Sequence, residues 1–277
     1  MMIINFPVDV ESLEVVGEEF EPLTHPRMVR SHLQVDEKDF LLTVHQVASY
    51  RVRNGNQVWI HPCKEADESD VELFLNGSVL GALLHQRGLL PLHGSSFVLE
   101  GKGVVICGRS GAGKSSVVAA FCQNGGRLIN DDISPVRISE ERTVMIPLRS
   151  SIKLWSDSLE KLKIGNDNLK RIRPSLDKFY VASPAACPDE TELHHLFILA
   201  NHNKDDFEVT ELSGLAKFNA LRRVIYRKGY LKGMPETEKG YFGQLVQMGK
   251  SVRVTQVFRP QICNIYNAME RIRREMV

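Results

Sequence analysis

One segment of this 277-residue sequence matches the phosphate-binding loop pattern G-x-x-x-x-G-K-[ST] in full. An apolar run at 104–107 precedes the loop as an expected strand, and residues 114–123 follow it as an expected helix. The glycines let successive backbone N–H groups converge on phosphate oxygens, and the helix adds its positive N-terminal end. We therefore predict an α/β nucleotide-binding core, with a glycine-rich turn carrying an exposed lysine as the alternative.

Within this loop, Lys114 is placed to neutralise the β- and γ-phosphates, and the Ser115 hydroxyl is placed to reach Mg²⁺. The expected cofactors are ATP, or another nucleoside triphosphate, together with Mg²⁺. The residues expected to bind the nucleotide are Gly108, Ser110, Gly111, Ala112, Gly113, Lys114, Ser115 and Ser116.

Two adjacent acidic residues, Asp131 and Asp132, come directly after the next expected strand at 127–130. Side chains at this edge of an α/β sheet can reach a metal ion or an attacking group. Neighbouring residues point to different sides, so one carboxylate could coordinate Mg²⁺ while the other accepts a proton. Without the loop, the pair would equally suit a solvated turn or a helix cap. His93, just before the first strand of the core, alone is more typical of a packed or surface histidine.

The rest of the chain predicts two domains, at 1–66 and 67–277. The first is a small β-rich module with apolar runs at 41–44, 50–53 and 58–60 and an Asn54-Gly55-Asn56 hairpin turn. The second begins with an apolar helix face from 70 to 87, ended by Gly88. Its further expected strands are 96–99, 193–199 and 207–210, and its further helices are 215–226 and 261–276.

Composition limits the partners and the cellular compartment expected for this protein. The formal net charge is +1, from 35 basic and 34 acidic side chains, so no global field favours nucleic acid or an anionic membrane as a partner. No apolar run approaches the length needed to cross a bilayer, and the N-terminal residues do not resemble a secretion signal. The five cysteines are scattered and without metal-ligand spacing, as expected for reduced thiols. We therefore expect a cytoplasmic protein, and its sequence leaves a homo-oligomer open.

Three segments together resemble the catalytic domain of HPr kinase/phosphorylase and its serine-kinase relatives. They are Leu92-His93-Gly94, the loop at 108–115, and the run 127–132 that ends in the two aspartates. His93 lies 21 positions before Lys114 (114 − 93), and Asp132 lies 18 positions after it (132 − 114), as in that family. The resemblance implies a P-loop kinase core of the HPr kinase C-terminal-domain type. It also implies that Asp132 accepts the proton of a serine hydroxyl with His93 beside it, which leaves Asp131 with Ser115 for the metal.

The sequence departs from that family after the acidic pair. Where the bifunctional members carry Glu-Ile/Val-Arg-Gly, the best match here is Pro147-Leu148-Arg149-Ser150, which keeps the arginine but loses the acidic metal ligand. We therefore expect the forward reaction only, without reverse phosphorolysis. The N-terminal module also differs from that of HPr kinase. The chain looks more like the stand-alone relatives, some of which phosphorylate a lasso-peptide precursor.

A basic stretch from 170 to 180 is the expected contact for the second substrate. Arg171, Arg173 and Lys178 lie there beside two aromatic residues, and Arg149 is added through the family resemblance. A solvated surface strip is the alternative. The expected function is an ATP- and Mg²⁺-dependent serine kinase acting on a peptide or protein. A kinase of a small hydroxylated metabolite and a non-catalytic nucleotide-dependent switch are the other two hypotheses.

Overall fold

The structure is a computed structural model that describes residues 6–148, 151–173, 175–183 and 186–276. It shows a mixed α/β protein with several sheets, and two compact units share the chain. The first unit comprises residues 1–91 and 226–243, and the second comprises 92–225 and 244–277. The domain boundary expected between residues 66 and 67 stays a prediction, because compactness alone does not define a functional domain.

The first unit contains a six-stranded sheet in the order β1-β6-β5-β4-β3-β2. Its strands are β1 (Ser12–Val15), β2 (Met28–Arg30), β3 (Leu33–Val35), β4 (Asp39–Val44), β5 (Ala48–Arg53) and β6 (Gln57–Pro62). The expected hairpin joins β5 to β6. Asn54 and Gly55 have φ values of +53° and +64° there, which the tight turn requires and which these two residue types tolerate best.

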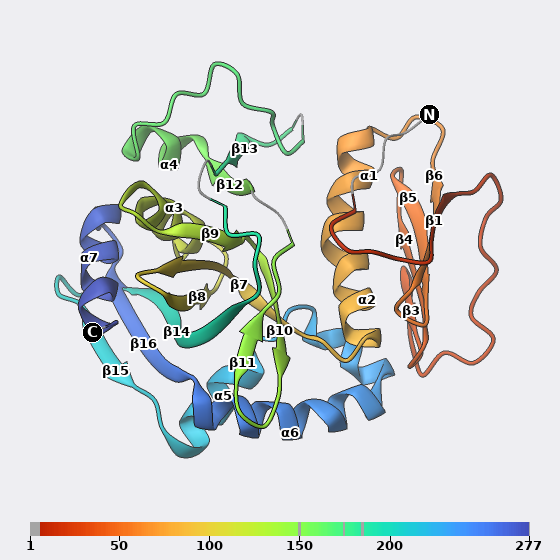
Figure 1. Cartoon of the computed structure of the whole chain (residues 1–277). Helices are drawn as coiled ribbons and strands as arrows, with labels where there is room; N and C mark the ends of the chain where they lie inside the picture. Colours follow the sequence, from red (N-terminus) through yellow and green to blue (C-terminus); the bar gives the residue numbers. More distant parts are fainter. Residues whose placement is uncertain (1–5, 149–150, 174, 184–185, 277) are drawn as a thin grey trace. The chain divides into compact units, whose positions relative to one another are not determined.

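A long helical segment accompanies this sheet within the unit (Figure 1). It runs as α1 (Glu68–Phe74), the π-helical turn η1 (Leu75–Val79) and α2 (Leu80–Gln86). The Asp67 carboxylate caps its start by accepting from the backbone N–H of Ser69, and Gly88 (φ +68°) follows its end. The expected helix and its terminal glycine are therefore confirmed, whereas the π-helical turn was not predicted. The 3₁₀ helix η2 (Lys228–Gly233) and the beginning of α6 (Pro235–Ser251) complete the unit.

The second unit is built on an eight-stranded sheet in the order β11-β10-β7-β8-β14-β16-β15, with β9 paired to β7. Its strands are β7 (Leu90–Leu99), β8 (Lys102–Gly108), β9 (Arg127–Asn130), β10 (Ile133–Ile138), β11 (Thr143–Met145), β14 (Thr191–His202), β15 (Glu208–Glu211) and β16 (Arg253–Pro260). A separate two-stranded antiparallel sheet pairs β12 (Ser151–Trp155) with β13 (Lys178–Ala182). The helices are α3 (Lys114–Gln123), α4 (Ser156–Lys161), α5 (Gly214–Arg223), the end of α6, and α7 (Ile265–Glu275).

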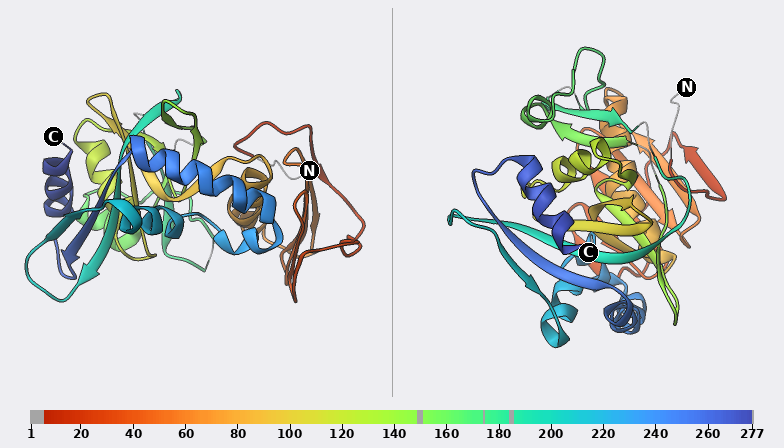
Figure 2. Two further views of the ribbon diagram at one scale, coloured as in Figure 1. Left: turned by 90° about the horizontal axis from the view of Figure 1, so that it is seen from below. Right: turned by 60° about the vertical axis from the view of Figure 1, so that its left-hand side comes forward.

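Helices α3 and α7 lie together on one face of this sheet (Figure 2). Their apolar side chains join those of β7, β8 and β14 in one core. The rings of Phe97 and Phe121 stack in this core with centroids 4.4 Å apart. Strands β8, β14 and β16 are parallel, so their carboxyl ends meet at one edge. The glycine-rich loop therefore begins at that edge. Across the described residues, no helix combines the length and apolar character that crossing a membrane would take.

Candidate functional site

The loop at 108–113 connects β8 to α3, in the strand–loop–helix order expected from the sequence. Gly108 fits only without a side chain, because a Cβ there would lie 2.3 Å from the carbonyl oxygen of Leu199 in β14. Gly111 and Gly113 adopt φ values of +81° and +97°, which glycine allows without strain. Lys114 is folded back over the loop, its Nζ donating to the carbonyls of Gly108 (3.0 Å) and Arg109 (3.3 Å).

The Asp131 carboxylate is held from three sides. Its Oδ1 accepts from the hydroxyls of Ser95 (2.6 Å) and Ser115 (2.8 Å), and its Oδ2 accepts from the backbone N–H of Lys153 (2.8 Å). The contact with Ser115 links the end of β9 to the first turn of α3. Two hard oxygen ligands therefore lie side by side, and Mg²⁺ is usually bound in proteins by one or two such groups plus phosphates and water. In the described parts of the chain, no three His, Cys, Asp or Glu side chains are grouped so that they could hold a metal ion by themselves.

Asp132 points away from Asp131, toward a group of cationic side chains. Its φ of +71° lies in the left-handed region, which Asp tolerates better than most residues other than glycine. Its Oδ1 lies 3.5 Å from Nδ1 of His93, and its Oδ2 lies 3.8 Å from Nζ of Lys153. Burial by itself would raise the pKa of Asp132, but Lys153, His93, Lys178 and Lys114 together hold that pKa below its ordinary value. The carboxylate is therefore ionised at neutral pH and 37% exposed.

These side chains surround one cavity of about 760 Å³ in the second unit. Expected residues that line it are His93, Ser110, Gly111, Gly113, Lys114, Ser115, Ser116, Asp131, Asp132 and Lys178. Gly108 and Ala112 belong to the same loop but are not among the described residues that line the cavity. Arg171 and Arg173 are not among the described residues that line the cavity, and Arg149 lies outside the described residues. Arg171 instead pairs with Asp177 at 3.2 Å and covers the ring of Phe179.

Sequence reasoning missed two cations at this cavity. Lys153 comes from β12, where Ile152 and Leu154 alternate inward, so the alternation could have placed Lys153 on the open face. Arg259 lies at the carboxyl end of β16, and its Nε donates to the carbonyl of Ala112 in the loop at 3.1 Å. The signal for Arg259 is its place at the end of a strand-like run, because side chains at that edge of an α/β sheet can reach the site.

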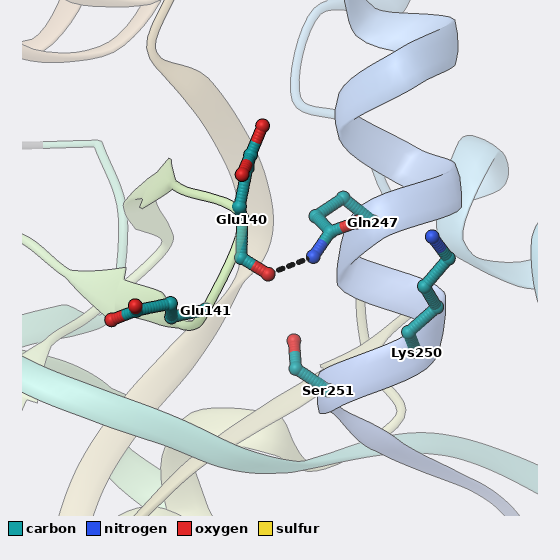
Figure 3. Close-up of a pocket in the computed structure, with 5 residues that line it drawn as sticks. All are labelled: Glu140, Glu141, Gln247, Lys250 and Ser251. Carbon is teal, nitrogen blue, oxygen red and sulfur yellow. Dashed lines mark hydrogen bonds between the residues drawn. The ribbon is translucent and has the colours of Figure 1, made fainter.

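A second cavity of the same unit lies between the β10–β11 turn and the end of α6 (Figure 3). It is lined by Glu140, Glu141, Gln247, Lys250 and Ser251, with the Gln247 side-chain amide donating to the carbonyl of Glu140. These lining residues include no apolar side chain that would bury a ligand. The cavity at the glycine-rich loop is therefore the candidate functional site.

Comparisons with known proteins identify no family for this chain. No protein-family model matches the sequence, and no curated protein matches it. Among solved structures, the chain is similar to the Hpr(Ser) kinase/phosphatase from Coxiella burnetii at 14% sequence identity and a TM-score of 0.34. The match covers 67% of this chain and 91% of that one. Similarity at this level carries no weight for the activity, which has to be inferred from the site itself.

Proposed function

We propose that this protein is an ATP- and Mg²⁺-dependent kinase that transfers a phosphoryl group to a serine hydroxyl of a peptide or protein. The observation that carries the proposal is the division of the acidic pair. Asp131 is bonded to the loop serine, whereas Asp132 faces the open cavity beside His93 and the lysines. Phosphoryl transfer needs both arrangements, one at the metal and one at the attacking hydroxyl.

The nucleotide would be held by the backbone N–H groups of the loop and by Lys114, which would exchange its loop carbonyls for phosphate oxygens. Ser115 and Asp131 would hold Mg²⁺, and when bound this ion neutralises negative charge on the phosphates. Arg259 holds the carbonyl of Ala112 at the helix side of the loop. This hydrogen bond fixes the loop where it joins α3.

Asp132 would orient the acceptor hydroxyl and accept its proton as the phosphoryl group departs from the nucleotide. A carboxylate with a low pKa is a weak base. Phosphoryl transfer, however, depends mainly on positioning of the attacking hydroxyl, and its proton can be accepted late in the reaction. His93 contributes to both, because its Nδ1 lies 3.1 Å from the backbone carbonyl oxygen of Asp132 and 3.5 Å from the carboxylate. His93 is therefore proposed as the neighbour that fixes the base.

The acceptor would enter beside Trp155 and Lys178, which lie on the two-stranded β12–β13 sheet and line the cavity. Nζ of Lys178 lies 5.6 Å from the centroid of the Trp155 ring, and the indole is 46% exposed. An exposed aromatic ring with a cation suits a peptide that carries a carboxylate near its serine. The sequence resemblance suggests a lasso-peptide precursor as the acceptor.

The decisive experiment is transfer of label from γ-labelled ATP to an array of serine-containing peptides. Label on serine supports the proposal if it is lost in the variants Lys114→Ala and Asp132→Asn. Label on hydroxylated metabolites alone would instead show a small-molecule kinase. ATP hydrolysis without transfer to any acceptor would favour the nucleotide-dependent switch. The forward-only expectation is tested on the labelled product, by adding inorganic phosphate and measuring pyrophosphate.

The depressed pKa of Asp132 makes a prediction about pH. Because the folded protein holds this pKa below 3.8, the active carboxylate persists at all higher pH values and is lost only below the ordinary Asp range. The acid limb of kcat/KM should therefore lie below pH 4. Lys153→Met removes the charge that contributes most to lowering the pKa of Asp132, so the acid limb of kcat/KM should move to higher pH. An acid limb unchanged by this substitution would contradict the role of Lys153.

Lys178 should act on the acceptor rather than on the nucleotide. We expect Lys178→Met to raise KM for the acceptor peptide about tenfold, as for loss of one charge-assisted hydrogen bond, with little change in KM for ATP. Arg171→Met is the matched control, because Arg171 pairs with Asp177 outside the cavity. A fall in kcat with both KM values intact would place Lys178 on the transferring phosphoryl group instead.

A further inference from the structure

A third cavity, with the dimensions of a small-molecule site, lies wholly within the first unit. Its volume is about 590 Å³, and sites for small molecules usually measure about 300–1,000 Å³. One wall consists of β2, β3 and β4, and the other consists of the helical segment at its π-helical turn together with residues 227–230. Apolar side chains, among them Leu33, Leu42 and Phe74, contribute to both walls. The cavity can therefore surround the apolar body of a ligand.

The charge in this cavity has one sign. Arg30 and Arg227 line it together with His32 and His45, and the described lining residues include no aspartate or glutamate. The chain as a whole is balanced, with 35 basic and 34 acidic residues, so the imbalance is local. A guanidinium group presents paired donors that match a carboxylate or a phosphate. The cavity is therefore suited to an anion rather than to a cation.

Two backbone irregularities meet in the wall of the same cavity. The π-helical turn η1 holds Ser78, which is 4% exposed, and Arg227 adopts a left-handed φ of +48° that disfavours a non-glycine residue. They are joined directly, because Nη2 of Arg227 donates to Oγ of Ser78 at 2.7 Å. The guanidinium also lies over the Tyr226 ring, 5.5 Å from its centroid. Both π-helical turns and strained residues concentrate at functional sites, and here both serve to orient Arg227.

We propose that this cavity binds an anionic organic molecule, with Arg227 and Arg30 at its carboxylate or phosphate head and Leu33, Leu42 and Phe74 around its apolar body. The site would be separate from the nucleotide cavity, since the two share no lining residue. Gly229 offers a way to block it. This glycine lines the cavity, and a Cβ added there meets nothing within 4 Å.

The test is titration of the full-length chain with three probes of equal chain length, which are hexanoate, hexyl phosphate and hexanol. We expect at least one anion to bind about tenfold more tightly than the alcohol, as for one charge-assisted bond. The preferred anion identifies the head group. Arg227→Gln and Gly229→Leu should each weaken that binding about tenfold. Arg27→Gln, which removes an exposed arginine paired with Asp36 outside the cavity, should leave it unchanged.

Arg30→Gln is the second charge variant, because Arg30 lies on an edge strand and does not contact the π-helical turn through Ser78. The thermal unfolding transition of each variant is compared with that of the parent protein, to check that the first unit is still folded. The proposal is overturned if hexanol binds as well as both anions, if no probe binds, or if Arg30→Gln and Gly229→Leu bind like the parent protein. Lys114→Ala should leave hexanoate binding unchanged, which separates this result from any failure of the proposed kinase activity.

Discussion

Lys114→Ala should lower the rate of phosphoryl transfer by about 10²- to 10³-fold, the usual cost of removing one preorganised electrostatic contact to a developing charge. The ammonium group donates to the carbonyls of Gly108 and Arg109, and in the proposed mechanism it contacts the β- and γ-phosphates instead. Alanine removes this charge while the loop glycines stay in place. Nucleotide affinity should fall as well, since the phosphate contact contributes to binding in the ground state.

The fold should survive this substitution, because α3 is held by its apolar face and not by Lys114. Circular dichroism and the unfolding midpoint provide the check. Lys102→Ala is the matched control, since Lys102 begins the same strand β8 and its Nζ bonds the carbonyl of Met276 away from the cavity. Equal turnover in Lys114→Ala and Lys102→Ala would show that the loop does not bind the transferred phosphate.

Asp132→Asn should separate binding from chemistry. Loss of a general base typically costs about 10²- to 10⁴-fold in rate, and we expect that loss in kcat with nucleotide binding retained. Asparagine suits this position because it tolerates the left-handed φ of +71° better than any other residue of similar size. The variant therefore keeps the backbone and changes only the charge.

Single-turnover transfer and calorimetric titration with ATP and Mg²⁺ measure the two effects separately. Asp157→Asn is the control, because this carboxylate lines the same cavity but pairs with Lys161 on the exposed side of α4. The opposite result would be lost binding of the metal–nucleotide complex with the residual kcat unchanged. Asp132 would then be a metal ligand, and Asp131 would become the candidate base.

The parts of the site that the sequence predicted are those that lie within short local patterns. The loop at 108–115 and the aspartate pair each follow a strand directly, so the strand ends place them at one edge of the sheet. The hairpin at Asn54-Gly55 was predictable for the same reason, since its geometry depends on two adjacent residues. For such features the residue types themselves determine the local backbone.

Features that depend on distant pairing were not predicted. Lys153 and Arg259 reach the site only because β12 pairs with β13 and β16 pairs with β14, and neither pairing has a local signal. The pairing of β13 with β12 places Lys178 at the cavity and leaves Arg171 outside it, although both lie in one basic stretch. Proximity in the sequence therefore did not predict which members of this stretch line the cavity, because tertiary pairing separates them.

Residues 226–243 belong to the first unit, and this affects the order in which the chain folds during its synthesis. Buried His85 depends on this segment, because its Nε2 bonds the carbonyl of Tyr226 at 2.9 Å and its Nδ1 bonds the hydroxyl of Tyr241 at 3.0 Å. A ribosome adding about 5–20 residues per second needs roughly 8–30 s to proceed from residue 91 to residue 243. During that interval the N-terminal unit stands incomplete, with the polar ring of His85 unsatisfied. Although first to emerge, this unit can finish folding only after most of the second one has been synthesised, and a nascent chain stalled before residue 226 should remain sensitive to protease there.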